Sequence, residues 1–244
     1  MRPGGELRIG TSGWNYGDWS GAFYPEPLKN RDYLSYYAQN FGTVEVNYSF
    51  YHLPRPETYL NWAGQTPEGF VFAVKASRVI THINRLRNVE ETWRKFLSNA
   101  EALGQKLGPV LLQFPPSFRV DLALLRDFLD IAGQQKVRLA FEFRHASWFR
   151  PAVAGLLRER GAALVIAQSS RYPQAPLEAT APFVYLRFHG PERLFGSSYN
   201  DEQLRGWAAR IREWLAAPLD VYVYFNNDFH GYALANARTL AALL

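Results

Sequence analysis

Ionisable and amide side chains recur where short apolar segments of the chain end. They are Glu45, Lys75, Glu142, Arg144, Arg187, His189 and Asn226. Paired carboxylates with a histidine can move protons, and lysine or arginine beside them can bind an anionic group of a substrate. We expect Glu142 and Glu45 to act in acid–base catalysis or metal binding and His189 to transfer a proton. The three cations among them are expected to hold the anion.

A second set of side chains is expected to orient the substrate or to surround the mouth of the site. Its polar members are Ser12, Asn47, Gln113, Asn226 and Asn227, and its aromatic members are Trp14, Tyr51, Trp148 and Tyr199. Aromatic faces can stack on sugars or nucleobases. Several of these rings could instead pack as lids over a cavity without touching a ligand, and the sequence leaves both alternatives open.

The segments that end in these residues are short and rich in β-forming residues, with helical patterns between most of them. They are Leu7–Thr11, Thr43–Asn47, Phe70–Lys75, Val110–Phe114, Val137–Phe143, Ala163–Ala167, Phe183–His189 and Val221–Asn226. Alternating strands and helices predict an α/β fold with parallel strands. Eight such units in 244 residues suit one eight-stranded (β/α)₈ TIM-type barrel. We therefore expect residues 1–244 to form a single domain.

The crossover after the sixth strand is expected to be irregular. Residues 169–182 are rich in proline and too short for a full crossover helix. An open doubly wound sheet is the alternative fold, but the chain has no glycine-rich phosphate loop of the kind such sheets carry.

Polar and apolar residues alternate within the strands, as Glu45 does between Val44 and Val46. Because successive side chains point to opposite faces, the apolar set can face the helices while the polar set points into the barrel. The polar residues concentrate at the carboxyl ends of the strands, where this architecture builds active sites. The alternative is a buried ion-pair network that only fixes strand register. If the charges serve function, Lys75→Met or Arg187→Met should cost little stability.

Composition excludes several classes of site and partner. The chain has no cysteine, which rules out disulfides, thiolate zinc sites and a cysteine nucleophile. A net charge of +5 without a block of like charges permits anionic ligands and does not require nucleic acid. No apolar run approaches the length of a membrane span, and the first residues lack a signal-peptide pattern. We expect a cytoplasmic protein with no membrane partner, and its oligomeric state stays open.

The strand ends, taken in order, resemble those of the YecE-like family, also called domain of unknown function family 72. The matching runs are Gly10–Trp14, Phe23–Pro25, Glu45–Asn47, Phe50–Tyr51, Phe72–Lys75, Thr81–His82, Gln113–Phe118, Glu142–His145, Ser147–Trp148, Tyr185–Gly190 and Asn226–Asp228, with Trp19 between the first two. The resemblance implies a TIM-type barrel and no assigned reaction. The family usually has an aspartate after the sixth strand, where this chain has Gln168.

The residues favour an enzyme that binds a small anionic or phosphorylated substrate without an organic cofactor. The loops after the last two strands read His189-Gly190-Pro191 and Asn226–Gly231, and a helix follows the second. Phosphate often lies at these loops in TIM barrels, although Asp228 could simply cap that helix. Cations beside Glu45 and Glu142 make a glycosidase less favoured, because they lower carboxyl pKa values.

Two further alternatives are kept. Glu45, Glu142 and His189 leave room for a divalent metal ion, and together with the aromatic loops and arginines this suits a nucleic-acid binder or a metal-dependent nuclease. The other alternative is a non-catalytic ligand-binding protein, which Gln168 keeps open.

Overall fold

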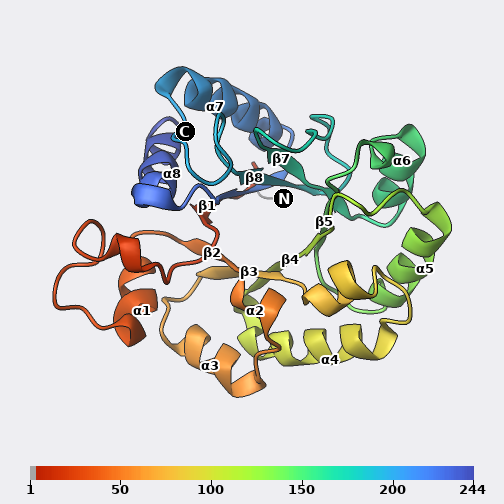
Figure 1. The fold of residues 1–244 in the computed structure, drawn as a ribbon, viewed down its shortest axis with the longest axis horizontal. Helices are drawn as coiled ribbons and strands as arrows, with labels where there is room; N and C mark the ends of the chain where they lie inside the picture. The colour runs from red at the N-terminus through yellow and green to blue at the C-terminus, as the bar shows by residue number, and fades with distance from the viewer. Residues whose placement is uncertain (1–3) are drawn as a thin grey trace.

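The computed structural model describes residues 4–244, with the strands at the centre and helices around them (Figure 1). The strands are β1 (Leu7–Thr11), β2 (Thr43–Val46), β3 (Val71–Lys75), β4 (Leu107–Gln113), β5 (Leu139–Glu142), β6 (Ala163–Leu164), β7 (Ile166–Gln168), β8 (Phe183–Phe188) and β9 (Asp220–Phe225). The helices are α1 (Tyr33–Tyr37), α2 (Tyr48–Tyr51), α3 (Pro56–Gly64), α4 (Glu90–Ala100), α5 (Leu122–Ala132), α6 (Pro151–Glu159), α7 (Asp201–Ala216) and α8 (Tyr232–Ala242).

The strands form two parallel sheets, so the expectation of eight strands in one sheet is corrected. One sheet has the order β1-β9-β8-β7 and the other has the order β2-β3-β4-β5-β6. The sixth expected strand is divided at Val165, so β6 pairs with β5 and β7 pairs with β8. A bridge between Ser12 and Glu45 links the ends of β1 and β2. The arrangement is α/β and TIM-barrel-like.

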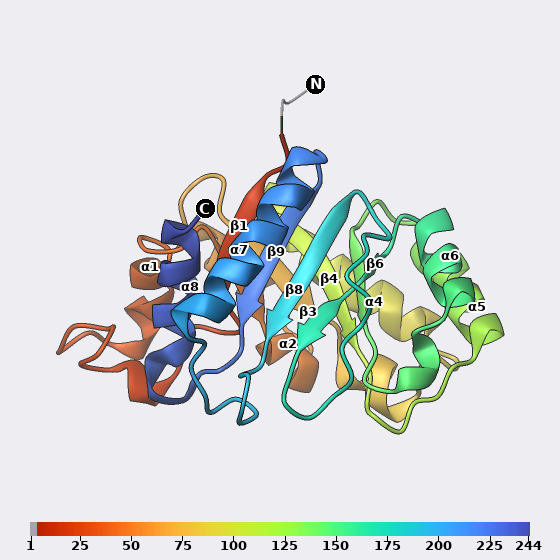
Figure 2. The same cartoon turned by 90° about the horizontal axis from the view of Figure 1, so that it is seen from above.

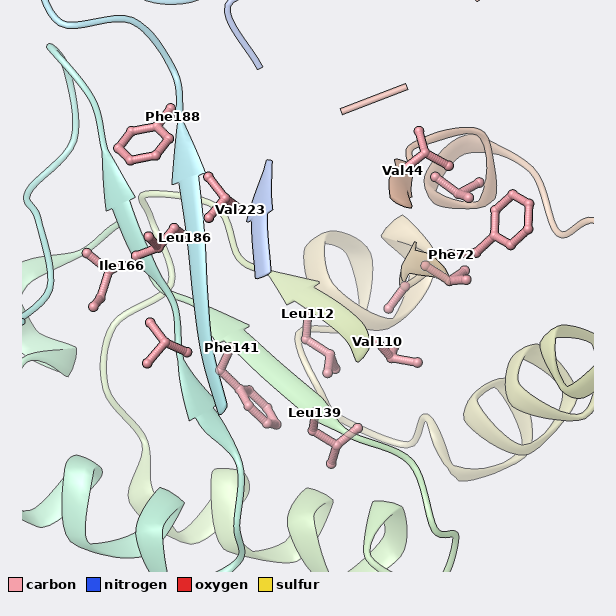
Figure 3. Packing of buried hydrophobic residues seen from close by; sticks show 14 of the residues in the cluster. Val44, Phe72, Val110, Leu112, Leu139, Phe141, Ile166, Leu186, Phe188 and Val223 are labelled. Atoms are coloured by element: carbon pink, nitrogen blue, oxygen red, sulfur yellow. The ribbon is translucent and has the colours of Figure 1, made fainter. Parts of the chain in front are cut away.

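The two faces of the strands carry different side chains, as the alternation predicted. Val44, Phe72 and Val110 belong to the large hydrophobic cluster that also contains residues of the surrounding helices, and Figure 3 shows part of it. The other face carries a small separate cluster that includes Ala73 and Tyr185. This inner face also carries Glu45 and Arg187, which are fully buried.

Local signals read from the sequence fix several helix ends. Asp121 accepts a hydrogen bond from the backbone N–H of Leu124 (3.0 Å) at the start of α5. Asn200 and Gln203 form a capping box at the start of α7.

The crossover between β7 and β8 contains no helix, so the expected irregular connection is confirmed. In Figure 2, β8 and β9 run side by side and α2 lies toward their carboxyl ends.

The helices of residues 4–244 are too short or too polar to cross a lipid bilayer.

Candidate functional site

A buried ionic network occupies the inner face of the strands. Arg187 of β8 donates from Nε to Glu45 Oε2 (2.9 Å) and from Nη2 to Glu45 Oε1 (2.6 Å). Its Nη1 donates to Glu142 Oε2 (2.5 Å). All three side chains are at most 1% exposed. The guanidinium therefore bridges carboxylates from β2 and β5, with two of its bonds in the bidentate geometry that suits arginine.

Hydroxyl groups satisfy the remaining acceptor positions of Glu45. Ser12 Oγ donates to Oε1 (2.7 Å) and Tyr185 OH donates to Oε2 (2.8 Å). Burial raises the pKa of Tyr185 well above its ordinary value, and the neighbouring Glu45 raises it further, so the phenol stays a donor. With four hydrogen bonds from protein groups, Glu45 has little capacity left for a substrate or a metal ion.

Glu142 is held ionised by two arginines. Its Oε1 accepts from Arg144 Nε (2.8 Å) and its Oε2 accepts from Arg187. Burial alone would raise the pKa of Glu142, but Arg187 and Arg144 outweigh it and hold the pKa well below its ordinary value. A carboxylate in this state is a weak base and a poor proton donor near pH 7.

His189 lies beside this network and is fully buried. Its Nδ1 is 3.0 Å from Asn226 Nδ2, and its Nε2 is 3.8 Å from Glu142 Oε1. Burial lowers the pKa of His189 well below its ordinary value, and Arg187 lowers it further. The imidazole is therefore neutral at pH 7 and contacts the ionic network rather than the solvent.

A cavity of about 720 Å³ lies next to the network. Its lining residues are Tyr16, Gly17, Asp18, Asn47, Phe50, Tyr51, Lys75, His82, Gln113, Arg144, Phe195, Asn226, Asp228 and Phe229. They come from the carboxyl ends of strands and from the loops that follow. This is the face where the sequence placed the site, and a cavity of this size suits a small molecule.

Lys75 ends β3 and reaches the cavity without a carboxylate partner. Its Nζ lies over the ring of Phe50, 4.2 Å from the centroid. Within residues 4–244, no Asp or Glu oxygen lies within 4.0 Å of this amine. Burial lowers the pKa of Lys75 and Arg187 lowers it further, against the opposing effect of Glu45 and Glu142, to about 7. Near neutral pH the amine is therefore present in both protonation states.

Arg144 is the second cation in the cavity wall. Its Nε is committed to Glu142, and its guanidinium lies over the ring of Tyr172 at 4.4 Å. In the described part of the chain, its two terminal nitrogens have no hydrogen-bond partner. One edge of the guanidinium is fixed in position and the other remains free to donate to an oxyanion.

Asp228 and Tyr16 line the cavity on the side of β9 and β1. Asp228 Oδ1 is buried and has no hydrogen-bond partner within residues 4–244. Burial raises the pKa of Asp228 to about 7, and the nearby Glu45 raises it as well, against the opposing effects of Tyr16 and Arg187. The sequence suggested Asp228 as a helix cap, but its side chain makes no cap hydrogen bond at Phe229–Gly231, so that alternative is wrong.

The structure separates the predicted site residues into three groups. Those in the cavity wall are Asn47, Tyr51, Lys75, Gln113, Arg144 and Asn226. Those in the buried network beside it are Ser12, Glu45, Glu142, Arg187 and His189. The rest, Trp14, Trp148, Tyr199 and Asn227, lie outside this cavity wall. The predicted convergence of charges from different strands is therefore present, but fewer of them than expected reach the cavity.

The residues outside the cavity wall have local partners. Trp148 stacks on Phe143 at 4.0 Å and donates to the carbonyl of Phe118 (2.7 Å). Asn227 donates to Asn236 Oδ1 (2.9 Å). Trp14 lines a neighbouring cavity of about 500 Å³, which shares Tyr16 and Asn47 with the first.

Gln168, at the position of the usual family aspartate, has a local partner as well. Its Oε1 accepts a hydrogen bond from Tyr199 OH. The residue is absent from the cavity wall. Gln168 therefore takes no part in the described lining of the cavity.

Several residues of the cavity wall were not singled out from the sequence, among them Gly17, Asp18, His82 and Phe195. His82 lies in the π-helical turn Val79–Ile83, its Nδ1 lies 2.9 Å from Thr81 Oγ1, and its ring contacts Phe50. Burial lowers its pKa to about 4, helped by Lys75 and Arg144. The adjacent Thr81 and His82 in the family pattern were the one signal that pointed to this segment.

Metal coordination would require rearrangement of these side chains. Within residues 4–244, no three His, Asp or Glu side chains are grouped in a way that could hold a metal ion. Glu45 and Glu142 already bind Arg187, so an ion between them would have to displace the guanidinium.

Comparison with known proteins places these features in a family. UPF0759 protein YunF of Bacillus subtilis (strain 168) is 28% identical, with 98% of this chain and 94% of YunF covered. UPF0759 protein YecE of Escherichia coli (strain K12) is 28% identical, with 74% of each chain covered. A DUF72 family protein from Thermotoga maritima MSB8 has a similar solved structure, with a TM-score of 0.87, 29% identity and 98% of each chain covered.

A more distant likeness concerns the fold alone. A D-psicose 3-epimerase, whose structure is TIM-barrel-like, has a TM-score of 0.56 and 11% identity, with 96% of this chain and 97% of that chain covered. The family model described as "Protein of unknown function DUF72" matches residues 8–244. The chain therefore belongs to the DUF72 family, as its strand ends suggested.

Proposed function

We propose that this protein is an enzyme that binds a small anionic substrate in the 720 Å³ cavity. The observation that carries the proposal is a pair of cations in the cavity wall, Lys75 and Arg144, whose nitrogen donors are not fully used by acceptors within residues 4–244. Three cations, Lys75, Arg144 and Arg187, lie close to two carboxylates, Glu45 and Glu142. Asp18 and Asp228 line the same cavity but form no ion pair with Lys75 or Arg144 within the described residues, so both cations can bind an anion in the cavity.

Arg144 is the proposed anchor for the anionic group. Its Nε–Glu142 bond and its stacking on Tyr172 fix the plane of the guanidinium. A carboxylate or phosphate can then receive two parallel hydrogen bonds from the free edge with little loss of side-chain freedom. Asn47, Gln113 and Asn226 would orient the neutral part of the substrate.

Catalysis, rather than binding alone, is supported by two groups with shifted pKa values in the same wall. Lys75 and Asp228 both titrate near pH 7, where general acid–base groups are most effective. We therefore assign proton transfer to Lys75 and Asp228. From the sequence, this role was expected of Glu45, Glu142 and His189. The buried residues keep Arg187 and Arg144 in position.

The proposal also assumes a closed barrel. We infer that β6 and β7 act as one strand and that the two sheets join into a closed barrel of eight strands. The Ser12–Glu45 bridge at one seam supports this, as does the hydrogen bond from Val165 N to Phe141 O (2.9 Å) at the other.

The test is calorimetric titration with inorganic phosphate. Wild-type protein should bind phosphate saturably, and Arg144→Met should weaken binding at least about tenfold, which corresponds to ~1.4 kcal/mol. Arg126→Met removes an exposed arginine on α5 and serves as the matched control that keeps wild-type affinity. Equal affinity of the Arg144 variant and the wild type would refute the anchor.

A further inference from the structure

Within residues 4–244, Lys75 differs from the two arginines of the site in having no carboxylate oxygen within 4.0 Å of its amine. Arg187 contacts Glu45 and Glu142, and Arg144 contacts Glu142. The Lys75 amine lies over the Phe50 ring, 4.2 Å from its centroid, and Lys75 lines the cavity. A neutral amine at this position can therefore react with a compound bound in the cavity.

The surroundings of Lys75 favour the neutral amine. Burial and the neighbouring guanidinium of Arg187 lower its pKa to about 7, while Glu45 and Glu142 oppose them. Arg144 lowers it as well. His82, in the π-helical turn Val79–Ile83, is neutral at pH 7 because its own pKa is about 4. Desolvation and adjacent cations are the two environments that activate lysine as a nucleophile.

The proposed anion anchor lies in the same wall. A substrate whose carboxylate or phosphate binds Arg144 would place its nearby carbons in the cavity that Lys75 also faces. A small cavity with a fixed anion site and a free amine is suited to a compound with a carbonyl group a few bonds from its negative charge.

We propose that Lys75 forms an imine with a small anionic carbonyl compound, with the carboxylate or phosphate of that compound bound by Arg144. This inference rests on the proposed function for the identity of the anion site. It adds a covalent role for Lys75 and restricts the substrate to carbonyl compounds.

The step balances without a further reactant. The neutral Nζ attacks the carbonyl carbon, the C–N bond forms, and the carbonyl π electrons move to oxygen. The two protons of the amine transfer to this oxygen, which leaves as water, and the product is an imine. Protonation of the imine makes it an acceptor for electrons from a bond at the adjacent carbon. Return of water releases the carbonyl compound and restores the amine.

Reductive trapping tests this directly. The full-length protein is incubated with pyruvate or with dihydroxyacetone phosphate, and cyanoborohydride reduces any imine to a stable secondary amine. Intact-mass measurement should show one adduct per chain with at least one of the two compounds, and peptide mapping should place it on Lys75. The two compounds distinguish a carboxylate from a phosphate as the anion.

Variants provide the controls. Lys75→Arg keeps a cation but cannot form an imine, so it should lose the adduct, whereas Lys95→Arg on the exposed face of α4 should retain it. Trapping should fall severalfold between pH 8 and pH 6, as Lys75 becomes protonated. An adduct spread over surface lysines, or no adduct with either compound, overturns the proposal. If Lys75→Arg does not fold, mapping of the wild-type adduct still decides the outcome.

The two proposals fail in different ways. Phosphate binding that depends on Arg144, with no adduct at Lys75, would leave the anion site intact and remove the imine. Trapping of the neutral ketone acetone at Lys75, with no effect of Arg144→Met on trapping of the anionic compounds, would show imine formation without the anion anchor.

Discussion

Arg187→Met removes the guanidinium that lies between Glu45 and Glu142. Three charge-assisted hydrogen bonds of 2.5, 2.6 and 2.9 Å are lost, and both carboxylates stay buried. Removing one partner of a buried ion pair typically costs about 3–5 kcal/mol, because the remaining charge is left without compensation. Glu142 retains Arg144, and Glu45 retains the hydroxyls of Ser12 and Tyr185. We therefore expect a loss within this range rather than twice it.

The measurement is urea unfolding at pH 7, followed by tryptophan fluorescence. Arg126→Met, on the surface of α5, should change the free energy of unfolding by less than about 0.5 kcal/mol. The double variant Arg187→Met with Glu45→Leu should be more stable than the sum of the single changes implies, because it no longer buries that unpaired carboxylate. A loss below about 1 kcal/mol for Arg187→Met would refute the assignment of Arg187 to a structural network.

The pH dependence of the same variants gives an independent check. In the wild type the folded-state pKa of Glu142 lies below its ordinary value of 4.5. Its stabilising contribution is therefore present above that value and lost as the pH falls below it. In Arg187→Met, Glu45 and Glu142 stay buried without the Arg187 guanidinium, so burial raises their pKa values in the folded state. The folded protein then binds more protons than the unfolded chain, and the free energy of unfolding should rise as the pH falls from 7 to 5.

Three further predictions concern the cavity. Lys75→Met should be more stable than the wild type at pH 7 in urea unfolding, and the gap should shrink toward pH 10, because the folded pKa of about 7 lies below the unfolded value of 10.5. Asp228→Asn should match the wild type near pH 4 and exceed it above pH 7, because the raised pKa of Asp228 makes folded wild type lose stability as the pH rises through this window; equal stability at pH 8 would contradict this. If the chain binds single-stranded DNA through its arginines, affinity in fluorescence anisotropy should fall steeply between 50 and 200 mM salt, on the order of 10³-fold; binding that is insensitive to salt would exclude that alternative.

The strand ends could be predicted because period-two alternation assigns each residue a face. Glu45 between Val44 and Val46 has to point away from the helices if the valines pack on them. The same reasoning places Arg187 and Glu142 on the inner face. Their meeting inside the fold thus followed from pattern alone.

The depth of each side chain along the strand direction could not be predicted in this way. Arg187 and Glu45 are separated by 142 positions in the chain, and their contact depends on strand register and on the reach of a long side chain. Register pairs Gln113 with Glu142 and Lys75 with Leu111, which the sequence does not specify. The expectation that Arg187→Met would cost little stability was made without knowledge of this depth, and the burial of Arg187 leads us to expect a loss instead.

The burial of the loop residues in the cavity wall could not be predicted either. Asp228 and His82 have no periodic pattern, and their shifted pKa values arise from burial by segments far away in the sequence. Tyr16, which lies near Asp228, comes from the loop after β1, more than two hundred positions earlier. The sequence offered a capping role for Asp228, because it contains no information on what covers that carboxyl group.

The buried network explains why Lys75 has no carboxylate partner in the part of the chain that the structure describes. Each carboxylate near Lys75 already binds an arginine whose bidentate or fork geometry an ammonium cannot match. Arginine stays protonated in such surroundings, whereas a lysine without a carboxylate loses its proton more readily. The pairing of two arginines with the two glutamates thus leaves Lys75 as the member of the cluster that can change its charge. If this reasoning is right, Glu142→Gln should leave Arg144 and Arg187 with less compensation and lower the pKa of Lys75 further, which would shift the pH dependence of trapping at Lys75 to lower pH.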